Sequence, residues 1–243
     1  MSDQFSYFNA KQITWIVKIV YNSEGEEKSD FLAGGFSIDG AAIHPEGGGL
    51  IMTCAHSFKR GLNYEIYVRR LDQDTFYPAD VIKEKSEWNI FLLKVRGYSE
   101  NIFRDFINNG DLHVGQPIYM IGSFLNFHAS FINGMVVFPC DNGARVPLNG
   151  QICGEISQFE WYTQDTYRVM GDMMDRVNRN VYRLVFSRLP VIQFESNFSK
   201  SGAPIFHSTG EIVGMVIGPY CGNLMIGVHV SVLRKFVQDL KDQ

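Results

Sequence analysis

Short apolar runs separated by turn residues repeat along most of the chain. The first runs are ITWIVKIVYN, GGFSID, GLIMTCAH, YEIYVRR, residues 77–95 and PIYMIG, separated by turn segments such as Asn22–Gly25 and Gly47–Gly49. After a link at 123–128 come FINGMVVFPC, QICGEISQF, VYRLVFSRLPVIQF, APIFHS, EIVGMVIG and LMIGVHV. Closely spaced runs of this kind are typical of β-sandwiches and barrels. The pattern predicts an all-β chain with two β halves in series, over residues 12–122 and 129–230.

Two segments have helical periodicity instead. Residues 231–240 place apolar side chains three and four positions apart, which predicts an amphipathic C-terminal helix that docks on the body. Residues 164–178, inside an insertion at about 160–182, carry Tyr167 and three methionines on one face. This second helix is predicted either to pack in the core or, because thioethers suit adaptable surfaces, to bind a partner or cover a cleft.

Composition narrows the class of protein. With 243 residues, 45% of them hydrophobic and 20% charged, the chain is long enough for a single domain over 1–243. The net charge is −4 with no basic block, which argues against nucleic acid or an anionic membrane as a partner. No signal peptide or membrane span is recognisable, so we expect a soluble intracellular protein in the cytoplasm or nucleus. The scattered Cys and His residues lack metal-ligand spacing, and we expect no metal and no cofactor.

The candidate chemistry lies in two distant segments. His56 follows the apolar strand LIMTCA, so it leaves the strand end and can point into a cleft. Ser201 stands in Ser199-Lys-Ser-Gly-Ala-Pro204, where small residues allow a sharp turn that exposes the hydroxyl. Acyl transfer needs such a nucleophile, a base that titrates near neutrality and donors for an oxyanion. The backbone amides of Ser199 and Ser201 are the candidate donors.

Taken together, these segments resemble a known family. Thr53-Cys-Ala-His56 resembles the Thr-Ala-Ala-His of trypsin-like serine proteases, and Lys200-Ser-Gly-Ala-Pro204 resembles their X-Ser-Gly-Gly-Pro. The frame is similar to the HtrA/Deg branch in its order of GGFSIDG, VGQPIYMIGS, FINGMVV, VIQF and MIGVHVSVLRKFV. The resemblance implies a chymotrypsin-like fold of two six-stranded antiparallel barrels. It also implies hydrolysis of exposed or unfolded polypeptide, and a homo-oligomer, which in this family is often a trimer.

The resemblance breaks at the third member of the catalytic triad. The family has an aspartate in a stretch like Asp-Ile-Ala-Leu-Leu-Lys-Val, and this chain has Asn89 in Asn-Ile-Phe-Leu-Leu-Lys-Val95. An amide carries no charge and can donate its NH₂ to Nδ1 of His56, which would place the histidine proton on the wrong nitrogen. In a trypsin-like enzyme this change costs about 10⁴ in kcat.

Other departures from the family point the same way. Ser199 stands where the oxyanion hole usually has Gly, and Glu195 lies near the position of trypsin's pocket acid, where it would select basic substrate residues. The sequence thus predicts a weak serine endopeptidase using His56, Asn89 and Ser201. The alternatives are a pseudoprotease that binds peptide or protein without efficient turnover, and a structural partner protein that uses the 164–178 helix.

Overall fold

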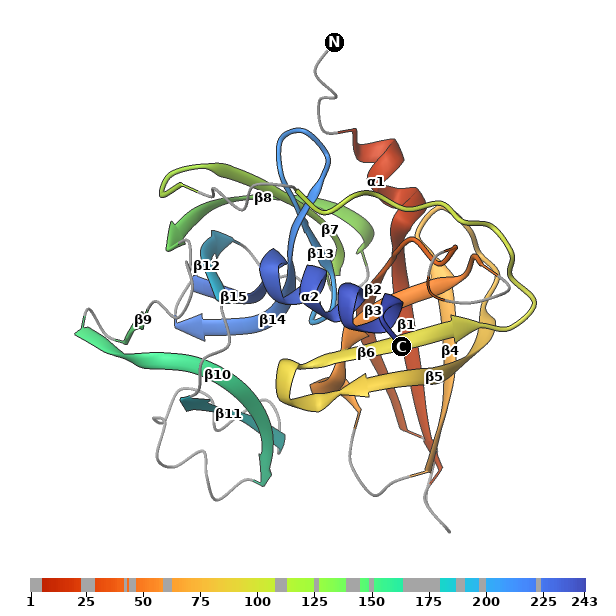
Figure 1. Ribbon diagram of the computed structural model, residues 1–243, viewed down its shortest axis with the longest axis horizontal. Coiled ribbons are helices and arrows are strands. Elements are labelled where there is room, and N and C mark those ends of the chain that lie inside the picture. The colour runs from red at the N-terminus through yellow and green to blue at the C-terminus, as the bar shows by residue number, and fades with distance from the viewer. Residues whose placement is uncertain are drawn as a thin grey trace.

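A computed structural model shows two β-barrels, an additional small sheet and two α-helices (Figure 1). It describes residues 6–22, 29–41, 43, 47–58, 63–107, 113–124, 127–138, 145–148, 151–163, 180–186, 191–196, 200–221 and 224–243. Both barrels are closed, with six antiparallel strands each, so the predicted fold class is confirmed.

The first barrel comprises the first six strands. They are β1 (Thr14–Asn22), β2 (Ser29–Ser37), β3 (Leu50–Cys54), β4 (Asn63–Arg70), β5 (Tyr77–Lys85) and β6 (Ile90–Val95). Around the barrel their order is β1-β2-β3-β6-β5-β4. Every residue of β3 is buried, while β4 alternates buried and more exposed side chains, as expected when one face of a strand meets a core. The first barrel therefore holds β3 firmly in place, and the C-terminal end of β3 leads directly to His56.

The second barrel begins earlier than the sequence pattern predicted. Its strands are β7 (Pro117–Phe124), β8 (Phe127–Phe138), β12 (Val191–Ser196), β13 (Pro204–Phe206), β14 (Ile212–Cys221) and β15 (Leu224–His229), in the order β12-β15-β14-β13-β7-β8. The run PIYMIG was predicted in the first half, but β7 pairs with β8 and β13. Residues 123 and 124 thus belong to β7 and residues 127 and 128 to β8, so this segment is not the link between halves and the predicted boundary at 122 is wrong. Six strands already close the first barrel and leave no edge for β7.

An insertion between β8 and β12 forms a separate sheet. It contains β9 (Arg145–Leu148), β10 (Gln151–Thr163) and β11 (Asn180–Phe186), with β10 in the centre. The runs QICGEISQF and VYRLVF are therefore strands, as predicted, but not strands of the barrel. The barrel closes without them because β8 pairs directly with β12. The helix predicted at 164–178 lies outside the described residues, and the insertion on either side of it is β-structure.

The chain has one helix near each end. The C-terminal helix α2 (Val230–Lys241) was predicted, and it buries Val232, Leu233 and Phe236 against the body. The N-terminal helix α1 (Tyr7–Ile13) was not predicted, because seven residues are too few to show a helical period. Its Tyr7 hydroxyl donates to the Ala129 carbonyl, at 2.6 Å, and so ties α1 to the second barrel. None of the described helices has the length and apolar character needed to cross a bilayer.

One apolar cluster runs through both barrels and under α2. It contains Phe36 and Met52 from the first barrel, Phe206 and Ile226 from the second, and Leu233 from the helix. Two smaller clusters fill the interior of the separate barrels. The shared cluster fixes the orientation of the barrels, and at their junction β3 lies against β14 and β2 against β13.

Candidate active site

His56 lies directly after the buried strand β3, as the sequence predicted. The strand ends at Cys54, and His56 is in the short 3₁₀ turn η1 (Ala55–Ser57). The imidazole is only 3% exposed, so it does not project into open solvent. Burial lowers the pKa of His56 from 6.5 to about 3, an effect that its hydrogen bond with Asn89 opposes. The base candidate is therefore neutral over the physiological pH range.

Asn89 is held beside His56 by its own backbone. It caps the 3₁₀ turn η2 (Ser86–Trp88) with a left-handed φ of 58°, a conformation that Asn adopts more readily than most residues. Its N–H donates to the Ser86 carbonyl at 2.9 Å, and its carbonyl accepts from the Ala55 N–H at 3.1 Å. The side chain is 1% exposed. The turns η1 and η2 are thus joined, which brings the predicted pair together.

The amide of Asn89 presents its oxygen, not its NH₂, to His56. Oδ1 lies 2.9 Å from the backbone nitrogen of His56 and 2.8 Å from Nδ1 of the same residue. A backbone N–H can only donate, so the atom that faces it has to be the oxygen; in the flipped amide the NH₂ group would face this N–H, and two donors would oppose each other. Because the same oxygen can only accept, Nδ1 of His56 has to carry the proton, and Nε2 is then the basic nitrogen. The wrong tautomer suggested by the sequence argument is therefore not the one this geometry favours.

Ser201 lies in a tight turn that packs against the first barrel. The Gly34 N–H of β2 donates to the Ser201 carbonyl at 2.7 Å, and the Gly34 carbonyl accepts from the Thr53 hydroxyl at 2.6 Å. Thr53 precedes His56 by three residues on β3. Gly34 therefore joins the segment that carries His56 to the segment that carries Ser201. The sequence indicates Gly34 and Gly35 only as part of the strand run GGFSID, because a backbone contact between distant segments leaves no local signal.

The turn after Ser201 requires glycine for two reasons. Gly202 has a φ of +88°, and a Cβ there would lie 2.3 Å from the Gly34 carbonyl oxygen and 2.7 Å from the Thr53 hydroxyl. We expect Gly202→Ala to lower the free energy of unfolding by about 3 kcal/mol, from the strained φ and the forced overlap together. Urea denaturation measures the loss.

A matched control separates these two effects. Gly115 has a similar φ of +82°, but a Cβ there has nothing within 4 Å. Gly115→Ala should therefore cost only the backbone term, about 1 kcal/mol. Equal losses for the two variants would contradict the close approach of the Ser201 turn to Gly34.

The Ser201 hydroxyl donates its single proton to the carbonyl of Ile217 on β14, at 2.6 Å. That proton is therefore not directed at His56 in this conformation. A bond of this kind between neutral groups contributes about 1 kcal/mol, so rotation of the hydroxyl toward the imidazole costs little. Ile217 was not singled out from the sequence, because no residue type marks a backbone acceptor.

The structure describes the remaining predicted site residues only in part. Ser199 lies outside the described residues. Glu195 is in β12, with its backbone paired to Met135 and Leu224, and its side chain also lies outside them. Lys200 beside the turn is half-buried, which lowers its pKa. Glu84, an acidic side chain close in sequence to Asn89, is exposed and accepts a hydrogen bond from the Ser86 hydroxyl.

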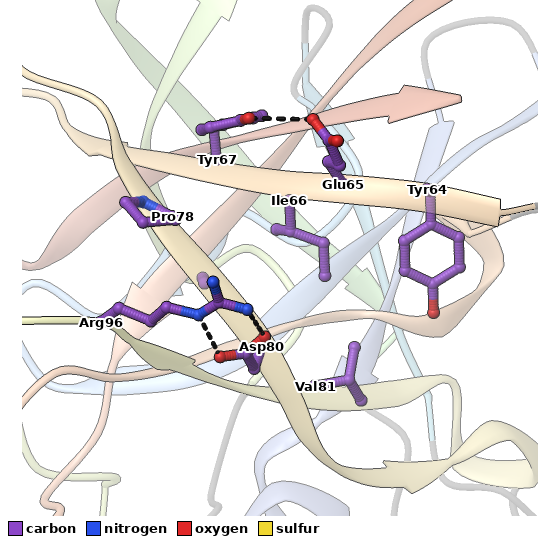
Figure 2. A pocket seen from close by; sticks show the side chains of 9 residues that line it. Tyr64, Glu65, Ile66, Tyr67, Pro78, Asp80, Val81 and Arg96 are labelled. Atoms are coloured by element: carbon purple, nitrogen blue, oxygen red, sulfur yellow. Dashed lines mark hydrogen bonds and ion pairs between the residues drawn. The ribbon is translucent and has the colours of Figure 1, made fainter. Parts of the chain in front are cut away.

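A cavity of about 420 Å³ opens elsewhere, in the first barrel (Figure 2). It lies between β4 and β5, whose pairing stops at Ile66 and Ala79, so the two strands diverge beyond that point. Its charged groups are already satisfied, with Arg96 paired to Asp80 and Glu65 accepting from the Tyr67 hydroxyl (Figure 2). None of His56, Asn89 and Ser201 lines it.

Within the described ranges, no three His, Cys, Asp or Glu side chains are grouped to hold a metal ion.

A double barrel with a histidine at the end of β3 and a serine turn before β13 is the plan of the trypsin-like peptidases. The trypsin-like peptidase domain model matches residues 35–215, and the chain belongs to that family. No curated protein matches the sequence.

Solved structures with the same fold include the Rv3671c protease from M. tuberculosis in its active form. It is 16% identical, with a TM-score of 0.62 over 96% of this chain and 83% of that one. An inactive form of the same protease is 14% identical, with a TM-score of 0.59 over 96% of this chain and 90% of that one. At these identities the likeness concerns the fold alone.

Proposed function

We propose that the chain is an HtrA/Deg-like serine endopeptidase that hydrolyses exposed or unfolded polypeptide, with Ser201 as nucleophile and His56 as base. The proposal rests mainly on the contact between Asn89 and His56. One amide oxygen accepts from both the backbone N–H and Nδ1 of His56, at 2.9 and 2.8 Å. That arrangement leaves Nε2 as the nitrogen able to take a proton from a serine hydroxyl.

The chemical steps follow from these roles. Oγ of Ser201 turns from the Ile217 carbonyl, attacks the scissile carbonyl carbon and gives its proton to Nε2 of His56. The backbone amides of Ser199 and Ser201 would stabilise the oxyanion. The imidazolium then protonates the leaving amine, and a water molecule, deprotonated by the same imidazole, hydrolyses the acyl ester and regenerates Ser201.

Turnover by this route should be slow. An amide orients the imidazole but supplies no charge to stabilise the imidazolium that forms during the reaction. Burial, which lowers the pKa of His56 to about 3, further weakens the base. The trypsin-like geometry therefore supports a peptidase with a small catalytic advantage.

The second candidate is a pseudoprotease that binds peptide or protein. Two observations favour it: the imidazole is 3% exposed, and the Ser201 hydroxyl is bonded to Ile217. Both features describe a site that is not arranged for catalysis. The two candidates differ in whether Ser201 becomes a nucleophile at all.

A fluorophosphonate probe, which phosphonylates activated serines, tests the difference. We expect labelling of the native chain at Ser201, complete loss in Ser201→Ala, and no change in Ser208→Ala, a control in the turn after β13. Peptide mapping by mass spectrometry identifies the labelled residue. Binding of an unfolded polypeptide without any labelling would support the pseudoprotease instead.

A further inference from the structure

The base candidate is buried, and a part of the chain that belongs to neither barrel lies beside it. His56 is 3% exposed, and its neighbours Ser57 and Asn89 are 1% exposed. Two turns carry these residues, η1 and η2, and both lie against the inserted strand β10, with Cα atoms within 8 Å. Figure 1 shows β10 outside the barrels, beside the turn that joins β5 to β6. A substrate carbonyl has to come within hydrogen-bond reach of the nucleophile and base, which a covered imidazole prevents.

We propose that the β9–β10–β11 sheet is an autoinhibitory cover, and that the site becomes accessible when this sheet moves away from η1 and η2. The proposal rests on the proposed peptidase function, because only a catalytic His56 gives the cover something to inhibit. The new claim is that the insertion of the resting chain blocks access to its own active site.

The topology allows such a movement without unfolding the barrels. Among the described strands, those of the insertion pair only with one another. The second barrel is closed without them, because Phe138 at the end of β8 pairs with Gln193 of β12. Within the part of the chain that the structure describes, no ladder hydrogen bond of either barrel therefore has to break when the sheet moves. Segments that are not paired into the central sheets open at lower free-energy cost than the core strands.

The state of the site agrees with a closed enzyme. The Ser201 hydroxyl is bonded to the Ile217 carbonyl, at 2.6 Å, and the buried imidazole is neutral. Removal of the cover exposes His56 to water, which weakens the desolvation that depresses its pKa. A single movement would therefore admit substrate and strengthen the base.

Diethyl pyrocarbonate, which acylates accessible neutral imidazoles, measures the cover directly. At pH 7 we expect His56 of the intact chain to react at least about tenfold more slowly than the exposed His113, because it reacts only from an opened state. The main variant replaces residues 139–190 by a loop of about five residues, a length that suits adjacent antiparallel strands such as β8 and β12. In this variant His56 should react about tenfold faster while His113 is unchanged.

A milder variant serves if the shortened chain does not fold. Glu160 lies in the middle of the part of β10 that pairs with β11, opposite Arg183, and Glu160→Pro breaks the ladder there. We expect it to raise the reaction rate of His56 by a smaller factor. Comparable rates for His56 and His113 in the intact chain, or an unchanged His56 rate in a folded variant, would overturn the proposal.

Fluorophosphonate labelling of the same variants separates this proposal from the peptidase function. If His56 becomes reactive and Ser201 is labelled faster, both stand. If His56 becomes reactive and Ser201 remains unlabelled, the cover stands and the peptidase function fails. If Ser201 is labelled at the same rate in all chains while His56 is unaffected, the cover fails and the peptidase function stands.

Discussion

Asn89→Asp should raise the rate of peptide hydrolysis by about 10²-fold, because a charge would be added where only an oriented dipole exists. The carboxylate oxygen would take the place of Oδ1 and keep both bonds to His56, at 2.9 and 2.8 Å in the present chain. Opposite charges about 4 Å apart attract by about 4 kcal/mol at an effective dielectric constant of about 20. Burying the new carboxylate offsets part of that attraction, and the remainder gives the expected factor.

The expected gain is smaller than the 10⁴-fold effect of this exchange in a trypsin-like enzyme, because the large effect includes a wrong histidine tautomer.

The Asn89→Asp variant should also be less stable toward unfolding than the native chain. Nδ2 of Asn89 is buried and has no hydrogen-bond partner among the described residues, so the second carboxylate oxygen would be buried without a donor. The measurements are kcat/KM against pH, in which the apparent pKa of the base should rise, and urea denaturation.

The control for this exchange is Asn133→Asp, which adds the same charge at an exposed position on β8. It should change neither rate nor stability. If Asn89→Asp raises the apparent pKa but not the rate, the prediction is contradicted, and the limiting defect lies elsewhere, with the oxyanion donors near Ser199 as the first candidates.

Acid should destabilise the fold strongly through His56. In the unfolded chain this histidine takes up a proton near its ordinary pKa of 6.5, whereas the folded chain resists protonation down to about pH 3. The unfolded state therefore binds more protons between these pH values, so stability is highest above pH 6.5 and falls as the pH decreases. The full loss, which is reached below pH 3, is about 5 kcal/mol, and about half of it has occurred near pH 4.5. Urea midpoints measured from pH 7 to pH 4.5 follow the loss.

The control for the acid effect is His56→Gln, which removes the titration and retains an N–H donor for Asn89. Asp80 and Glu100 also contribute to acid sensitivity, because hydrogen bonds from Arg96 and from Tyr98 lower their pKa values. Their contribution is common to both chains, so the difference between the two pH profiles isolates His56. Parallel profiles would show that the imidazole is not buried as described.

Much of the fold followed from local sequence pattern. The strand runs, the C-terminal helix and the two motif segments depend on short-range periodicity and turn chemistry, which a single sequence displays. The assignment of strands to barrels does not, because pairing partners far apart in sequence decide it. Thus β7 was placed in the wrong half, and β10 was assigned to a barrel although it belongs to a separate sheet.

The residues of the site could be predicted from the sequence, but their orientation and burial could not. His56 and Asn89 were paired from motif residues, and the structure brings them together. The direction of the Asn89 amide was not predictable, since it depends on a backbone N–H that every residue type provides. The turn that carries His56 contacts β10, which is far away in the sequence, and the sequence carries no local signal for such a contact.

The apolar cluster that spans both barrels has a consequence for folding. Each barrel has an apolar cluster of its own, but Phe36 and Met52 also share one interior with Phe206 and Ile226, so each half taken alone has only part of its core. The halves should therefore melt together in one cooperative transition, and a fragment cut between them would expose a large apolar face. A nascent chain of this protein would thus gain its final stability only when the last strands and the closing helix have been synthesised.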